Sequence, residues 1–121
     1  MSQIDKNDAP NEKEVREFLN NVFFLLPDGF IEFYRGANGA DISSDELYTI
    51  LWSLTDLFQL NKGYDVDEYA PGFFIFGSDG GDITFTIEKV TGKIFEMPFI
   101  GMSSEEAVFL FDSFDEFLQS R

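Results

Sequence analysis

The sequence predicts a single α+β domain, in which helices pack on one face of a mostly antiparallel sheet of about four or more strands. Apolar residues recur at helical spacing near both ends of the chain. The middle of the chain carries short β-branched and aromatic runs that are joined by glycine-containing turns, as in β-hairpins. A length of 121 residues is usual for one domain with one hydrophobic core. The predicted order of elements is α-α-β-β-β-β-α.

The N-terminal part of the chain is predicted to contain two consecutive helices. Residues 1–10 are polar and lack hydrophobic periodicity, so we expect a disordered lead-in before a single domain at 11–121. Asn11 with Glu14 three residues later is typical of a helix N-terminus. Apolar residues then recur at helical spacing: Val15, Phe18, Leu19, Val22, Phe23 and Leu26. Pro27 interrupts this pattern and can open a second, shorter helix.

Four strands are predicted in the middle of the chain. The first covers residues 47–54, where β-branched, aromatic and aliphatic side chains mix. Residues 73–76, 83–87 and 93–97 predict an antiparallel meander, because glycine-containing turns connect them. Residues 55–70 permit one helical turn and otherwise indicate a loop.

The C-terminal part is predicted to form one amphipathic helix. Ser103 and Glu106 have the spacing of a capping box. Apolar residues follow at helical spacing: Ala107, Leu110, Phe111, Phe114, Phe117 and Leu118. We therefore expect a final helix that packs its apolar stripe on the sheet.

The composition argues against several classes of function. The chain has no cysteine and no histidine, which removes the usual nucleophile–base pairs and the preferred ligands of zinc. Carboxylates are so abundant that a catalytic pair cannot be told from chance. We therefore expect no enzyme activity, no catalytic residue, no metal and no cofactor. The absence of a long apolar run and of a signal-like N-terminus leads us to expect a soluble, cytoplasmic protein that does not bind membranes.

The charge of the chain favours a basic protein as its partner. A formal charge of −15, from 23 acids and 8 bases, opposes direct nucleic-acid binding and favours a cationic surface. Residues 63–88 and 94–120 each contain six acids and no base. If the acids of the first stretch converge, they would form an electronegative docking patch. The candidate binding residues are Asp65, Asp67, Glu68, Asp79 and Asp82. The alternative is that these acids only keep the domain soluble.

Four motifs occur in order along the chain: 26–30 (LPDGF) leading to Asn38-Gly39, a strand that holds Trp52, 74–81 (FIFGSDGG) and 113–118 (SFDEFL). In this order the chain resembles the SUKH superfamily, Smi/Knr-type branch, from about Val15 to Leu118. The resemblance implies an α+β domain similar to immunity proteins that bacteria encode beside toxins, many of which are nucleases. The positions that match the family are expected to build turns and core: Pro27, Asn38, Gly39, Trp52, Gly77 and Gly80.

The resemblance implies that the protein binds and neutralises a cognate toxin without catalysis. An acidic surface would dock against the basic substrate groove of the toxin and exclude its nucleic acid. Fungal relatives imply an alternative, a non-enzymatic regulatory scaffold that binds a signalling or cell-wall synthesis protein. The oligomeric state is not predicted by the sequence.

Overall fold

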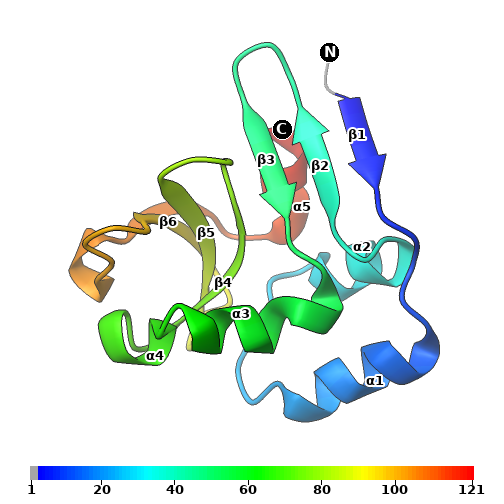
Figure 1. Ribbon diagram of the computed structural model, residues 1–121, viewed down its shortest axis with the longest axis horizontal. Coiled ribbons are helices and arrows are strands. Elements are labelled where there is room, and N and C mark those ends of the chain that lie inside the picture. The colour runs from blue at the N-terminus through cyan, green and yellow to red at the C-terminus, as the bar shows by residue number, and fades with distance from the viewer. Residues whose placement is uncertain (1–2) are drawn as a thin grey trace.

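The computed structural model describes residues 3–121, which form an open seven-stranded antiparallel sheet with helices packed on it (Figure 1). The sheet order β1-β2-β3-β4-β5-β6-β7 is also the chain order. The strands are β1 (Gln3–Lys6), β2 (Ala40–Ser43), β3 (Tyr48–Leu51), β4 (Phe73–Ser78), β5 (Ile83–Glu88), β6 (Ile94–Pro98) and β7 (Val108–Phe111). The helices are α1 (Glu12–Asn21), α2 (Phe30–Gly36), α3 (Leu57–Gly63), α4 (Val66–Tyr69) and α5 (Phe114–Gln119), with 3-10 turns η1 (Leu54–Asp56) and η2 (Ser104–Glu106). Within residues 3–121, no helix is both long and apolar enough to cross a membrane.

The predicted fold class and the predicted meander are confirmed. β4, β5 and β6 pair antiparallel with their sequence neighbours, Phe74 opposite Ile87 and Thr86 opposite Phe95. The predicted helix start is also confirmed, because the Asn11 side chain accepts a 2.8 Å hydrogen bond from the Glu14 backbone. The Glu14 side chain in turn accepts one of 2.9 Å from the Asn11 backbone.

The prediction of a disordered lead-in over residues 1–10 is wrong for Gln3–Lys6, and residues 1 and 2 lie outside the described part. Gln3–Lys6 is the edge strand β1, which pairs antiparallel with β2. All four of its side chains are exposed. The strand is held by backbone hydrogen bonds to β2. Because such bonds do not require buried side chains, the sequence of β1 shows no alternation of apolar and polar residues. A pattern based on burial therefore could not detect it.

The segment between α2 and β4 is more ordered than predicted. β2 was not predicted, although its side chains alternate between buried and exposed. β3 is shorter than the predicted strand at 47–54, since η1 begins at Leu54. The segment predicted as a helical turn and a loop, 55–70, contains the helices α3 and α4.

The predicted C-terminal helix is wrong over its first half. Ser103 precedes the 3-10 turn η2 and Glu106 is its last residue, and the chain then forms β7 before the short helix α5. In the apolar run Val108–Phe111, the residues Val108, Phe109 and Phe111 pair with β6 and complete the sheet. The helix begins later because Ser113 caps it, its hydroxyl accepting a 3.1 Å hydrogen bond from the Glu116 backbone.

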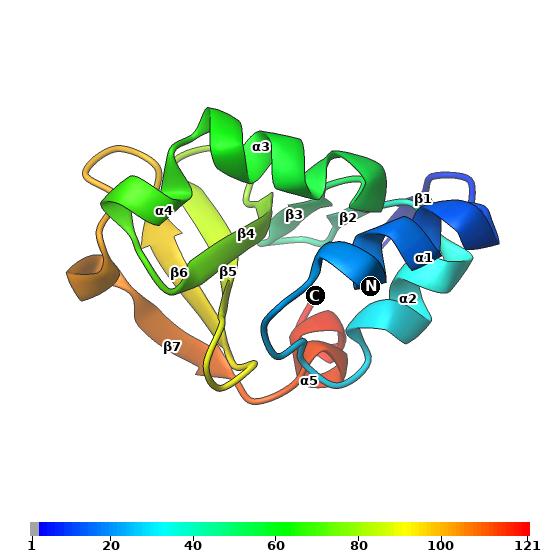
Figure 2. The same cartoon turned by 90° about the horizontal axis from the view of Figure 1, so that it is seen from below.

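The larger core lies between one face of the sheet and the helices α1, α2 and α5 (Figure 2). Aromatic rings fill it, with Phe30 and Phe114 at a centroid distance of 5.2 Å. The fully buried Tyr34 donates a 2.7 Å hydrogen bond to the carbonyl oxygen of Trp52. This burial raises the pKa of the Tyr34 hydroxyl well above its ordinary value. The core thereby fixes α2 against the end of β3.

A smaller core lies on the opposite face of β4. Val66 and Ala70 of the α4 segment pack there with Phe73 and Ile75. The alternate β4 residues, Phe74 and Phe76, belong to the larger core. All six residues of β4 are buried, so this strand connects the two cores.

Two glycines of the family-like motifs allow close backbone approach beside β3. Gly39 has a φ of +90°, and a Cβ there would lie 2.6 Å from the carbonyl oxygen of Leu51. A Cβ at Gly77 would collide with the carbonyl oxygen of Ile50. Both glycines therefore have a packing function in the scaffold.

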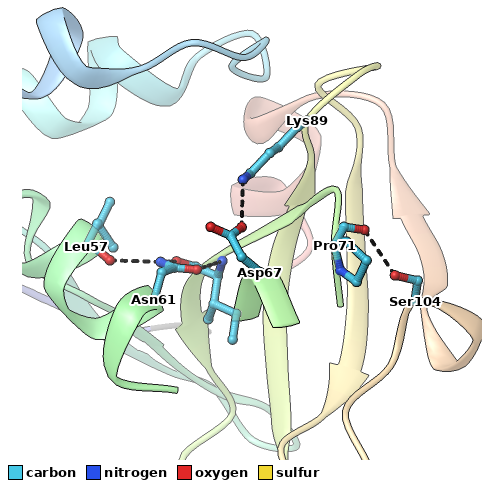
Figure 3. A network of polar contacts seen from close by, with 7 residues as sticks. Leu57, Asn61, Asp67, Pro71, Lys89 and Ser104 are labelled. Carbon is cyan, nitrogen blue, oxygen red and sulfur yellow. Dashed lines mark hydrogen bonds and ion pairs between the residues drawn. The ribbon is translucent and has the colours of Figure 1, made fainter. Parts of the chain in front are cut away.

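Asn61 joins α3 to the edge of β4. β3 pairs with β4 only at Gly77 and Ser78, so the start of β4 has no neighbouring strand on that side. The Asn61 side chain takes this place: its Nδ2 donates to the Ile75 carbonyl at 2.8 Å, and its Oδ1 accepts from the Ile75 N–H at 2.7 Å (Figure 3). Nδ2 also donates to Leu57 at 2.8 Å.

Replacing Asn61 should destabilise the protein strongly. Asn61→Ala leaves the N–H and C=O of Ile75 buried without partners, so we expect a loss of about 2–4 kcal/mol in the free energy of unfolding. The free energy of unfolding is measured by urea denaturation. The matched control is Asn21→Ala, which removes an exposed hydrogen bond of 2.7 Å to the Glu17 carbonyl. The control should change stability by less than ~0.5 kcal/mol; equal losses in both variants would contradict the role given to Asn61.

Candidate functional site

A groove of about 610 Å³ lies between the end of α1, the helices α3 and α4, the start of β4 and the end of β5. We call it the α3–α4 groove. Its lining residues are Asn21, Phe23, Phe24, Phe58, Asn61, Lys62, Asp65, Val66, Asp67, Glu68, Phe73, Phe74 and Lys89. They come from five separate parts of the chain, and three of the five predicted binding residues are among them.

The groove has an aromatic wall. Phe74 lies 5.0 Å from Phe24 and 5.4 Å from Phe58 between ring centroids. Phe58 is 36% exposed, and Phe23 at the groove is 90% exposed. An aromatic side chain this exposed is well suited to be buried by a partner, because aromatic residues dominate the energetics of interfaces.

Phe23 is exposed because α1 ends earlier than its apolar pattern predicts. The last helical residue is Asn21, and Val22 is already extended. The chain then continues towards the β5–β6 turn, where the Leu25 N–H donates a 3.0 Å hydrogen bond to the Lys89 carbonyl. The sequence placed Phe23 on the core face of the helix, and no signal in the sequence marks it as a surface residue.

The acidic residues of the groove lie in the short helix α4 and at the residue before it. Asp65, Asp67 and Glu68 are all exposed. Asp65 has a φ of 54° and turns the chain from α3 into α4. Aspartate tolerates this left-handed conformation better than most residues. Its position is therefore determined by the turn as well as by any role in binding.

Two lysines partly balance these acids. Lys89 Nζ lies 3.1 Å from Asp67 Oδ1 (Figure 3). It also lies 5.5 Å from the centroid of the Phe24 ring. Lys62 also lines the groove. Three acids against two lysines leave the groove only weakly negative. Most of the charge of −15 therefore lies elsewhere on the molecule.

The two acidic segments predicted to converge do not share one site. Asp65–Glu68 precede β4 and Asp79–Asp82 follow it, so the buried strand Phe73–Ser78 separates them by about 17 Å of extended chain. Asp79 instead lines a second cavity of about 430 Å³, together with Glu46 and Arg121.

Asp79 also has a structural role in the β4–β5 turn. Its Oδ1 accepts hydrogen bonds from the N–H groups of Gly81 at 2.8 Å and Ile83 at 3.1 Å. The Asp82 side chain is exposed, while its carbonyl accepts a 2.8 Å hydrogen bond from the Phe99 N–H. Across residues 3–121, no three His, Cys, Asp or Glu side chains lie close enough together to hold a metal ion.

Comparison with known proteins gives one family. The family model described as the SMI1 / KNR4 family (SUKH-1) matches residues 9–120. A search of curated proteins found no match. The matched region contains α1 to α5 and the whole α3–α4 groove. The family-like motifs, the α+β fold and this match agree, and the chain therefore belongs to the SMI1 / KNR4 family (SUKH-1).

Proposed function

We propose that this protein is an immunity protein, which binds and neutralises a cognate bacterial toxin without catalysis. The family to which it belongs is known for immunity proteins. The observation that carries the proposal is the α3–α4 groove, where an almost fully exposed phenylalanine stands beside an aromatic wall and an acidic helix. A nuclease is the class of toxin that fits the charge best, because its substrate groove is basic.

The two physical components of the surface would have separate roles. The net charge of −15 acts over a distance and speeds encounter with a basic protein. The groove itself is only weakly negative, so the affinity of the complex would come mainly from burial of Phe23 and its aromatic neighbours. Asp65, Asp67 and Glu68 would then contact basic side chains at the groove. Asp79 and Asp82 would contribute to steering from the other end of β4.

The proposal is tested by co-expression with the product of the adjacent gene. We expect that product alone to stop growth, and the pair to restore growth and to co-purify. A protein that co-purifies without being toxic would instead favour a regulatory scaffold for a signalling or cell-wall synthesis protein. A toxic neighbour that is neither bound nor neutralised would contradict the proposal.

Removing the exposed aromatic side chain should weaken the complex. Phe23→Ala should leave folding stability almost unchanged, because the side chain is 90% exposed in the free protein. Affinity for the toxin should fall by about 30-fold or more, as expected for an aromatic hot spot. Titration calorimetry measures the affinity. The matched control is Ile100→Ala, which truncates a side chain that is 88% exposed and does not line the groove; an equal loss in both variants would exclude the groove as the docking site.

Reversal of one charge at each end of β4 distinguishes contact from steering. Glu68→Lys and Asp82→Lys make the same change of charge at two exposed sites. Glu68→Lys should weaken binding about tenfold at low salt, because it both lowers the association rate and raises the dissociation rate. Asp82→Lys should reduce only the association rate, by about twofold. Stopped-flow measurements at two salt concentrations separate these effects. A larger effect of Asp82→Lys would place the docking site at the β4–β5 turn.

A further inference from the structure

The two edges of the open sheet differ in their chemistry. β1 at one edge has the sequence Gln-Ile-Asp-Lys, and β7 at the other has Val-Phe-Leu-Phe. Natural sheets usually protect an edge with charged residues, which prevent pairing with another chain. Asp5 and Lys6 give β1 this protection. β7 contains no charged residue.

The apolar side chains of β7 are partly exposed. Val108 is 56% exposed and Phe109 is 49% exposed. The Phe109 ring packs on Phe95 at 5.6 Å between centroids, so it is held in place rather than free. β7 pairs with β6 on one side, and the described residues provide no strand on its other side. Figure 2 shows β7 as the outermost strand at this end of the sheet.

The strand is short, and its pairing with β6 contains an irregularity. Phe111 lies opposite Ile94 and Phe109 opposite Phe95, so Leu110 is an extra residue on β7. Bulges are common at sheet edges and limit uncontrolled pairing. A partner strand would therefore be short as well.

Both ends of β7 are acidic. Glu105 and Glu106 precede the strand, and Asp112, Asp115 and Glu116 follow it; all five are exposed. Two bases lie near the strand: Lys93, whose Nζ is 3.5 Å from Asp112 Oδ1 and 5.8 Å from the Phe109 ring, and Arg121, which lines a cavity with Leu110. An apolar, unpaired edge between two acidic ends fits an extended segment with apolar residues in the middle and basic residues at its ends.

We propose that β7 is a docking edge, which accepts a short, extended, basic segment of a partner protein as an eighth strand. Backbone hydrogen bonds would supply affinity, and Val108 and Phe109 would contact alternate side chains of the added strand. A second copy of this chain fits less well. In either strand direction it would place the acids at the ends of one β7 beside those of the other, and each copy carries a charge of −15.

This inference rests on the proposed function only for the basic character of the partner, because no β7 residue lines the α3–α4 groove. The probe is a synthetic ten-residue peptide with four central valines, three lysines on each side and blocked ends, titrated into the isotope-labelled protein. We expect shifts of the backbone amide signals centred on β7, and slower hydrogen exchange of those amides that face outwards.

Peptides methylated on alternate backbone nitrogens test strand addition itself. Successive N–H groups of a strand point to opposite sides, so methylation of one alternate set removes the hydrogen bonds to β7 and methylation of the other set does not. One methylated peptide should therefore lose binding by about tenfold or more, while the other binds like the parent. Equal binding of both, or no shift at β7 with the parent peptide, would overturn the proposal.

Substitutions at the two edges give matched variants. Phe109→Thr replaces the ring by a small β-branched side chain that suits a strand, and it should weaken the peptide complex about fivefold. Ile4→Thr removes a similarly exposed apolar side chain from β1, where Ile4 is 47% exposed. It should leave the affinity for the peptide unchanged. Phe23→Ala should also leave peptide binding unchanged, so failure of this inference is separable from failure of the groove. A dimer of the free protein in sedimentation experiments, with β7 amides protected, would show that a second copy occupies the edge and would overturn the proposed occupant.

Discussion

The burial of β4 on both faces is the constraint on which the rest of the structure depends. Phe74 and Phe76 require a cover of helices on one side, and Phe73 and Ile75 require another on the opposite side. A strand covered on both faces must also have its backbone satisfied on both edges. β5 satisfies one edge, while β3 reaches only the last two residues of the other. Asn61 completes that edge at Ile75, so a side-chain amide joins α3 to β4.

The α3–α4 groove follows from this arrangement. Since α3 lies beside β4 where β3 does not pair, the chain must turn back sharply to begin β4, and it does so through Asp65 and the single turn of α4. α1 ends before it reaches this turn, and the extended residues that follow cross to the β5–β6 hairpin at Lys89. The concave surface between these segments is lined by Phe24, Phe58 and Phe74. The groove is thus a consequence of how the two cores meet at β4.

Those parts of the fold that depend on neighbouring residues could be predicted from the sequence. The meander was predictable because each hairpin carries its own turn and its own apolar run, and the Asn11 cap because it is a contact over three residues. β1 could not be predicted, since its pairing with β2 spans more than thirty residues and buries no side chain. The prediction for the C-terminal segment was wrong for another reason. The apolar residues at 107–118 have helical spacing, and residues 108–111 form a strand only because they can pair with the free edge of β6. The acids of the groove were visible in the sequence, but Phe23 and Lys89 join them only through tertiary packing.

Charge and apolar surface act at different ranges in this protein. A net charge of −15 gives a long-range preference for basic partners, but exposed charges are screened beyond about 8–10 Å at physiological salt and do not by themselves select one partner. Selection of one partner requires contacts that exclude water. The Lys89–Asp67 pair reduces the local charge of the groove, so binding there would depend mainly on such contacts. Phe23 at the groove and Val108 and Phe109 at the sheet edge are exposed apolar side chains next to acidic residues. At both places the acids can attract a basic protein, while the apolar residues can discriminate between basic proteins by shape.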